Sequence, residues 1–264
     1  MNRMAIGMMI VASLSLIGCG LFIGIEGSGN VISEDRDIDS EFSTIKLTNH
    51  VDIYVTIGDK VSLSLKGDDN LIPHVITRVS GNKLTIRSDK KLRKGYRTRK
   101  GLKAYLTVRK GQLKTIESTS HGDIILPELT GKDLFVEMSS HGDIEIDRIE
   151  GTDVTFELSS HGDLKIGYVK IENLDVDLSS HGDLFINDGE AVNQRISLSS
   201  HGDYMAKKMA SDTCHIQINS HGTAKLWVKK MLKGKVSGHG NLFYRGEPKL
   251  EIRKSSHGKI HSVD

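Results

Sequence analysis

Aromatic residues, prolines and net charge are what this sequence of 264 residues has least of. Aromatic side chains make up 5% of the chain, prolines number three, and the formal net charge is +2. A charge so close to zero gives no global electrostatic reason to expect a nucleic acid as partner. Glycine is abundant, with 27 residues, and aliphatic residues recur at regular positions, so the composition is not that of a disordered chain.

Cysteine is also scarce, and its two copies lie in different contexts. Two cysteines do not build a disulfide framework. Cys214 shares the parity of Ile216 and Ile218 in an alternating stretch, which predicts a buried free thiol without special reactivity. Cys19 instead ends an apolar N-terminal run.

The N-terminus predicts an export signal over residues 1–19. Arg3 precedes an apolar segment from Met4 to Ile17, shorter than the ~20 residues that a membrane-spanning helix needs. Leu16-Ile17-Gly18-Cys19 resembles the lipobox of bacterial lipoproteins, and this resemblance implies lipidation of Cys19. Several acyl chains would anchor the protein stably to a membrane. An ordinary secretory signal that contains a cysteine is the alternative.

The remaining chain is expected to comprise a tether and one folded region. Residues 20–29 are the predicted tether, and Gly20 after the cysteine favours the outer membrane in a bacterium with two membranes. Residues 30–264 are predicted to form a β-rich domain, less regular over 30–120 and regular over 121–264. We therefore expect a lipid-anchored protein of the bacterial cell envelope.

The less regular part contains two features of interest. Residues 45–55 alternate between apolar and polar, and His50-Val51-Asp52 resembles a unit that recurs later, which predicts an imperfect first coil. Residues 83–114 carry thirteen Lys and Arg against one Asp. They predict either a patch for phospholipid headgroups or acidic glycans, or a solvated surface loop. No aromatic residues interleave with these charges for base stacking, so we expect no nucleic acid.

A five-residue unit, Ser-Ser-His-Gly-Asp, recurs through the regular part. Ser-His-Gly-Asp ends at Asp123 and then every twenty residues as far as Asp203, and further histidines follow at His221, His239 and His257. A fixed period near twenty predicts a solenoid in which each repeat is one coil. We therefore expect an all-β fold, a single-stranded parallel β-helix with coils of ~20 residues, right-handed.

The parity of the repeat separates the inside of each coil from its outside. Residues spaced by two are apolar or small in successive coils, for example Leu134, Val136, Met138, Ser140, Gly142, Ile144 and Ile146. Side chains alternate between faces along a strand, so this set is predicted to point inward, with the serine and glycine at a bend. The first Ser, the His and the Asp then face outward, and coils stacked ~4.8 Å apart would align them in surface ladders.

The outward ladders are the candidate site. Imidazole suits Zn²⁺, Cu²⁺ or Ni²⁺, and neighbouring carboxylates can add ligands. The alternative is that these polar residues were copied with the repeat and only stack and hydrogen-bond. The candidate metal ligands are His121, Asp123, His141, Asp143, His161, Asp163, His181, Asp183, His201, Asp203 and His221.

A Ser-His-Asp set also suggests a catalytic triad, but the spacing argues against one. Residues two apart on a strand have Cα atoms ~6.5–7 Å apart, whereas a triad needs direct hydrogen bonds. We therefore expect no enzyme activity.

Residues 121–205 hold eighteen acidic and five basic side chains, whereas residues 206–264 hold twelve basic and four acidic. This asymmetry allows self-association, although salt screens it beyond ~8 Å.

Several of these motifs, in this order, resemble the bacterial head GIN domain family. They are residues 27–31 (GSGNV), the strand at 51–55, the segment 69–73 (DNLIP) and the repeated Ser-x-Gly-Asp motif, so the resemblance covers about residues 27–250. The resemblance implies a parallel β-helix, export and adhesion, and it supplies no catalytic residues. Where the family has Gly, Ser or Ala in the turn, this chain has His.

The expected function is a lipid-anchored envelope protein that binds a surface glycan or protein. The alternatives are a divalent-metal-binding lipoprotein and, more remotely, a polysaccharide-active enzyme.

Overall fold

The computed structural model describes residues 24–139, 141–159, 161–179 and 181–263. The predicted signal and the predicted lipidation site, Cys19, lie outside the described residues. Within these ranges, no helix combines the length and apolar character needed to cross a membrane.

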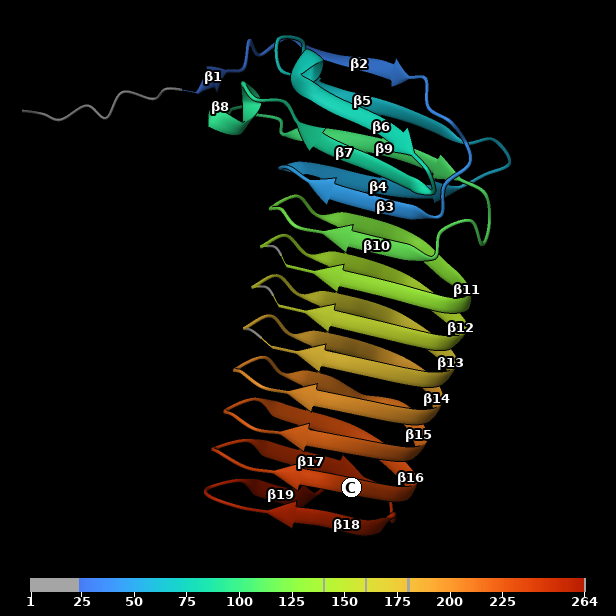
Figure 1. Ribbon diagram of the computed structural model, residues 1–264, viewed down its shortest axis with the longest axis vertical. Coiled ribbons are helices and arrows are strands. Elements are labelled where there is room, and N and C mark those ends of the chain that lie inside the picture. The colour runs from blue at the N-terminus through green and yellow to red at the C-terminus, as the bar shows by residue number, and fades with distance from the viewer. Residues whose placement is uncertain (1–23, 140, 160, 180, 264) are drawn as a thin grey trace, which may run out of the picture.

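Each regular coil consists of one long bent strand and one short turn. Neighbouring strands pair in parallel with an offset of twenty residues, as in the register that joins Ile144 to Leu164 and Leu164 to Leu184. Figure 1 shows these strands stacked in a column, with the bends at one edge and the turns at the other. The structure confirms the predicted parallel β-solenoid. The five strands of 15 residues are β11 (Ile124–Met138), β12 (Ile144–Leu158), β13 (Leu164–Leu178), β14 (Leu184–Leu198) and β15 (Tyr204–Ile218).

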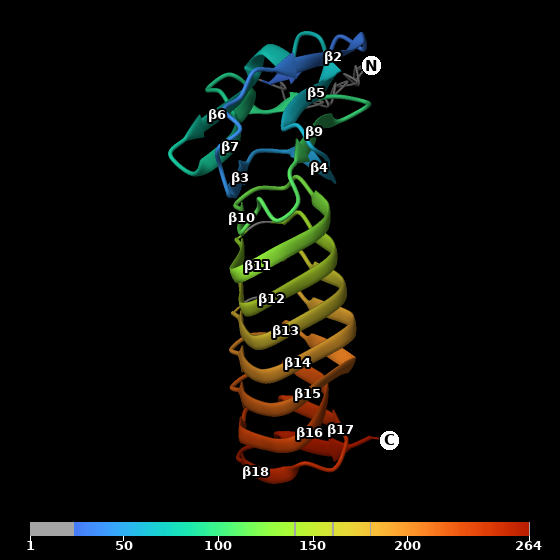
Figure 2. The same ribbon diagram turned by 90° about the vertical axis from the view of Figure 1, so that its right-hand side faces the viewer.

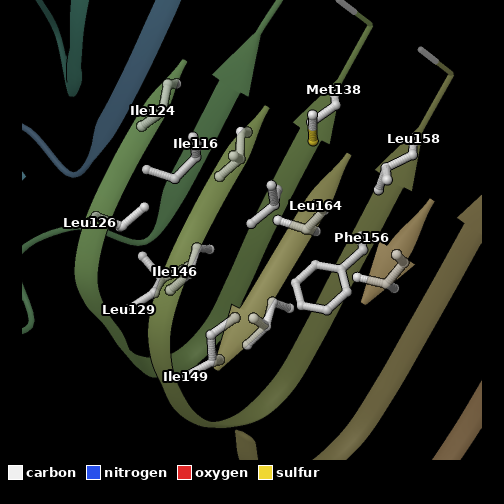
Figure 3. Packing of buried hydrophobic residues seen from close by; sticks show 14 of the residues in the cluster. Ile116, Ile124, Leu126, Leu129, Met138, Ile146, Ile149, Phe156, Leu158 and Leu164 are labelled. Carbon is white, nitrogen blue, oxygen red and sulfur yellow. The ribbon is translucent and has the colours of Figure 1, made fainter. Parts of the chain in front are cut away.

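The interior of the column is a stack of apolar side chains. Ile146, Phe156 and Leu164 are at most 1% exposed and point between the two walls of the coil (Figure 3). Each such side chain contributes ~1.5–3 kcal/mol by leaving water. The inward set predicted from the period-two pattern is therefore confirmed, except for Ser140, which lies outside the described residues. Cys214 is 1% exposed and free, also as predicted, and its burial raises the pKa of the thiol.

The first coil lies well before the regular repeats in sequence. β3 (Thr44–Thr48) and β4 (Val51–Ile57) pair in parallel with β10 (Thr115–Ser118) and β11. The turn between β3 and β4 contains His50, so the predicted imperfect first coil is confirmed. Residues 58–114 are an insertion between this coil and the next.

The insertion and the first described strands form a cap on this end of the solenoid (Figure 2). β5 pairs antiparallel with β2 and β9, and β6 pairs antiparallel with β7. Ile25 and Glu26, inside the predicted tether, pair with Tyr96 and Arg97, so ordered structure begins before residue 30. The elements of this region are β1 (Ile25–Glu26), β2 (Val31–Arg36), β5 (Ser62–Asp68), η1 (Ile72–His74), β6 (Val75–Ser80), β7 (Lys83–Ser88), η2 (Leu92–Lys94), β8 (Tyr96–Arg97) and β9 (Leu102–Val108).

The coils at the other end are shorter and interrupted. β16 pairs with β15 through register shifts, then with both β17 and β18, and β17 pairs with β19. The described residues place no antiparallel cap on this end. The strands are β16 (Thr223–Val236), β17 (Asn241–Arg245), β18 (Lys249–Lys254) and β19 (Lys259–Ser262).

Candidate functional site

The most regular surface feature is a stack of exposed histidines at the turn edge of the solenoid. Neighbouring ring centroids lie 4.6–5.1 Å apart and neighbouring planes deviate by at most 11°. The predicted ladder is therefore present, and His50 adds a member at its start. We call this set the histidine ladder: His50, His121, His141, His161, His181, His201, His221, His239 and His257.

Backbone hydrogen bonds to the preceding coil hold several of the ladder histidines in place. The amide of His141 donates to the carbonyl of Ser120 at 2.9 Å, and that of His239 donates to Ser220 at 3.0 Å. The glycine that follows is buried, and a Cβ on Gly162 would lie 2.1 Å from the carbonyl oxygen of Gly142. The glycine therefore does more than mark the predicted bend, because it permits close contact between the backbones of adjacent coils.

The aspartates form a second ladder with a structural role. The Oδ1 atom of each aspartate accepts a hydrogen bond from the backbone N–H one coil further on, at 2.9 Å for Asp123 and 2.8 Å for Asp183. The series begins at Asp52 and ends where Thr223 donates to Asp203 at 2.6 Å. These carboxylates therefore satisfy turn amides that otherwise have no partner in the strand ladder.

Burial and neighbouring carboxylates act together on some of these acids. The pKa of Asp183 is raised, first by partial burial and then by Asp203 and Asp163, while a backbone hydrogen bond opposes the change. The pKa of Asp52 is raised in the same way, first by burial and with a smaller contribution from Asp123. Carboxylate repulsion along the ladder is thus present.

The two ladders do not pair with each other. Among the described residues, the one His–carboxylate contact within 4.0 Å joins His74 to Asp89, outside the ladders. Over those same residues no ladder imidazole has a hydrogen-bond partner in the protein, so its ring nitrogens are available to solvent. A Ser-His-Asp relay is therefore not assembled in the described turns.

The stack limits how the histidines can bind a metal. The ring centroids of His141 and His161 lie 5.0 Å apart. Two coordination bonds of ~2.0–2.2 Å each are too short to connect one metal ion to two nitrogens separated by this distance. In the described ranges no group of three or more His, Cys, Asp or Glu side chains converges on one point. Chelation therefore requires the rings to rotate, and the predicted metal site stays a prediction.

The basic stretch at 83–114 lies in the cap and is partly neutralised. Lys83 contacts Glu117 at 2.5 Å, and Arg109 contacts Glu41 at 3.0 Å. Tyr96 reaches the start of the histidine ladder, where its hydroxyl donates to the carbonyl of His50 at 3.2 Å. Part of the stretch is therefore neutralised, and the predicted patch for phospholipid headgroups or acidic glycans stays a prediction.

The fold and the repeated polar edge define a capped parallel β-solenoid that presents one motif along a rigid face. The chain belongs to the head GIN domain family, because the family model described as "Putative auto-transporter adhesin, head GIN domain" matches residues 41–248. No curated protein matches the sequence.

Several solved structures share the fold. A "putative adhesin" from Parabacteroides merdae has a TM-score of 0.73 at 19% identity, with 91% of this chain and 99% of that chain covered. A "putative lipid binding protein" from Parabacteroides distasonis has a TM-score of 0.65 at 20% identity, covering 91% and 99%. A "putative adhesin" from Bacteroides fragilis has a TM-score of 0.60 at 23% identity, covering 91% and 100%. At these identities the likeness establishes the architecture alone.

Proposed function

We propose that this protein is an exported, lipid-anchored adhesin of the bacterial cell envelope and that it binds a surface glycan or protein through its outward ladder face. The observation that carries the proposal is a rigid solenoid of the head GIN family with one motif repeated along its exposed edge. A repeated motif on a rigid support suits a repetitive partner, because each additional contact raises the avidity without new chemistry.

The arrangement of the ends supports the same proposal. β1, close to the predicted anchor, lies at the capped end, and β18 and β19 lie at the opposite end (Figure 1). An anchor at Cys19 would therefore leave the solenoid free to project from the membrane. The lipobox resemblance of residues 16–19 is the sequence feature that supports the anchor.

The anchor and the adhesion can be tested separately. Metabolic labelling with palmitate followed by membrane fractionation should show lipidated protein in the membrane, and Cys19→Ala should abolish the label. Cells that display the protein should bind a glycan or host-protein array, and His141→Ala/His161→Ala/His181→Ala should weaken that binding. Wild-type protein without the palmitate label would count against the lipid anchor. Full binding by the triple variant would count against adhesion through the ladder face.

A second candidate function is binding of divalent metal by the histidine ladder. It is favoured by the imidazole nitrogens, which have no protein partner in the described part of the chain. Neutral imidazole binds Zn²⁺, Cu²⁺ and Ni²⁺, and rotation of neighbouring rings would bring two nitrogens to one ion. Calorimetry near pH 7.5 should give stoichiometric heats that the same triple variant reduces, and the absence of such heats in the wild type would reject it.

A further inference from the structure

A cationic groove lies on the last coils, at the end opposite the cap. It encloses about 620 Å³, and a second hollow of about 550 Å³ continues it toward Phe185. The two hollows share Met205, Lys207, Lys208 and Lys225, so they form one groove. Phe243 and Arg245 line its far part.

A change in coil length forms the groove. Ala206 pairs with Leu226, but the next pair joins Ala210 to Trp227, so residues 207–209 have no partner in β16. Lys207 and Lys208 are therefore carried on a bulge and are both exposed. β11 to β15 continue through this corner without such a shift, so the bulge is specific to the last coils.

The cations of the groove have no ion-pair partner among the described residues. Across the described residues, Lys207, Lys208 and Lys225 form no ion pair, and neither does Arg245. Lys165 occupies the same register column as Lys225, yet its Nζ contacts Asp143 at 2.6 Å. The counterpart of Asp143 next to Lys225 is Asp203, which lines the groove but forms no ion pair with this lysine.

The acidic ladder stops where these cations begin. After Asp203 the column continues with Thr223, Asn241 and Lys259, none of which is acidic. Asp203 itself lines the groove and is the one carboxylate among the described lining residues, against the cations Lys207, Lys208, Lys225 and Arg245. The groove is left with a local excess of positive charge, which attracts an anionic partner.

Aromatic rings lie beside the cations. Phe243 stacks on His261 with centroids 5.0 Å apart, and the Nζ of Lys225 lies 5.8 Å from the Phe243 ring. The guanidinium of Arg245 lies 4.4 Å from the Trp227 ring, which fixes its orientation before any ligand arrives. Apolar ring surface and oriented cations therefore occur within one groove.

We propose that this groove binds an acidic polysaccharide, a chain of sugars that carries carboxylate or sulfate groups. Lysine and arginine can form charge-assisted hydrogen bonds to the acidic groups, while aromatic surface packs against the sugar rings. Single-stranded nucleic acid fits less well, because a base-stacking platform needs a run of exposed rings. In this column Met205 and Lys225 separate Phe185 from Phe243, and Phe243 already stacks on His261. Under the proposed function the groove lies far from the anchored end, so the protein's own membrane is not its partner.

The test measures binding of full-length protein in detergent to polygalacturonate (carboxylate) and heparin (sulfate) at physiological salt. Dextran supplies a neutral control, and single-stranded DNA and phosphatidylglycerol vesicles represent the other anionic partners. Lys207→Gln/Lys208→Gln/Lys225→Gln should weaken binding of one acidic glycan at least ~10-fold, as expected from the loss of three charge-assisted contacts. Phe243→Ala removes no charge and should also weaken binding of that glycan, because the apolar contact with the sugar rings is lost.

The matched control is Lys90→Gln/Lys91→Gln/Lys100→Gln, which removes the same charge from the cap. It should leave the affinity for the glycan within ~2-fold, because screened charges at that distance contribute little. An equal loss in both triple variants would show non-specific attraction and overturn the proposal, as would tighter binding of DNA or vesicles than of either glycan. Neither result affects lipidation at Cys19 or adhesion through His141, His161 and His181, so the two proposals fail separately.

Discussion

The glycine after each ladder histidine has no space for a side chain, even one methyl group. A Cβ on Gly162 would lie 2.1 Å from the Gly142 carbonyl oxygen, and one on Gly142 would lie 2.3 Å from that of Gly122. Because the backbone of the preceding coil occupies the place of the Cβ, the coils must separate locally to accept it. Gly162→Ala should lower the free energy of unfolding by ~2–4 kcal/mol, measured by urea denaturation.

Ser159→Ala is the matched control for this change. Ser159 belongs to the same turn and is exposed, so its substitution should change stability by no more than ~0.5 kcal/mol. If Gly162→Ala were equally mild, the close approach of adjacent turns would not be a constraint in solution.

A buried, hydrogen-bonded polar pair lies within the apolar interior of the regular coils. The Tyr204 hydroxyl donates to Oε1 of Gln194 at 2.5 Å, and the two residues are 0% and 3% exposed. Tyr204→Phe would leave a buried amide oxygen without its donor, at a cost of ~1–3 kcal/mol in unfolding free energy. Thermal or urea unfolding of the variant gives the measurement.

The double variant Tyr204→Phe/Gln194→Leu separates the lost hydrogen bond from the lost hydroxyl volume. Leucine suits this position, since Leu174 precedes Gln194 in the same register column. The double variant should regain much of the stability that Tyr204→Phe loses, because no buried polar atom is left unpaired. A double variant less stable than the single one would mean that the pair contributes little.

At the scale of elements, the sequence shows the strands and the two faces because its period of two is unbroken. The inward positions from Leu134 to Ile146 and the outward histidines follow from that alternation alone. The role of the aspartates could not be read from it, because the bond from Asp143 N–H to Asp123 depends on the fold of the turn. The groove was also missed, since it arises from the pairing of Ala210 with Trp227 after a shortened corner.

The histidine ladder could be predicted in part. Its regular members share a period, whereas His50 precedes the insertion at 58–114 and is recognised only by the short echo His50-Val51-Asp52. The structure places it 4.6 Å from His121.

The pKa of His50 is lowered from its ordinary value of 6.5, first by partial burial of the ring and then by repulsion from His121. The Tyr96 ring meets it edge-on at 6.1 Å, and Asp52 lies two residues away. A base with a lowered pKa binds fewer protons in the folded state than in the unfolded state. Its contribution to stability is therefore complete above pH 6.5 and is lost as the pH falls through the lowered value.

We therefore expect the melting temperature to fall between pH 7.5 and 5, and His50→Gln to make this decrease smaller. The measurement is the difference between the melting temperatures of wild type and His50→Gln at each pH. The raised pKa of Asp52 acts in the opposite direction, but Asp52 is present in both proteins and its contribution largely cancels. His257→Gln is the control at the opposite end of the ladder, in contact with one neighbour and without a tyrosine against it. Identical pH slopes for wild type and His50→Gln would contradict the assignment.

The whole molecule is a rod with two different ends. Antiparallel strands of the insertion close one end, while within the described residues β18 pairs only with β16 and β19 only with β17 at the other. A free strand edge is a template for pairing with another chain, and natural proteins protect such edges with charge. β18 has the sequence KLEIRK, in which four of six residues are charged.

Removing charge from this edge should cause the rods to associate end to end. Arg253→Thr/Lys254→Thr keeps residues suited to a strand but removes two exposed cations, so larger species should appear in sedimentation velocity at micromolar concentration. Lys229→Thr/Lys230→Thr removes the same charge from β16, away from the open edge, and should leave the sedimentation coefficient unchanged. If both variants associated equally, lower net charge and not the exposed edge would be the cause, and the protective role of β18 would be rejected.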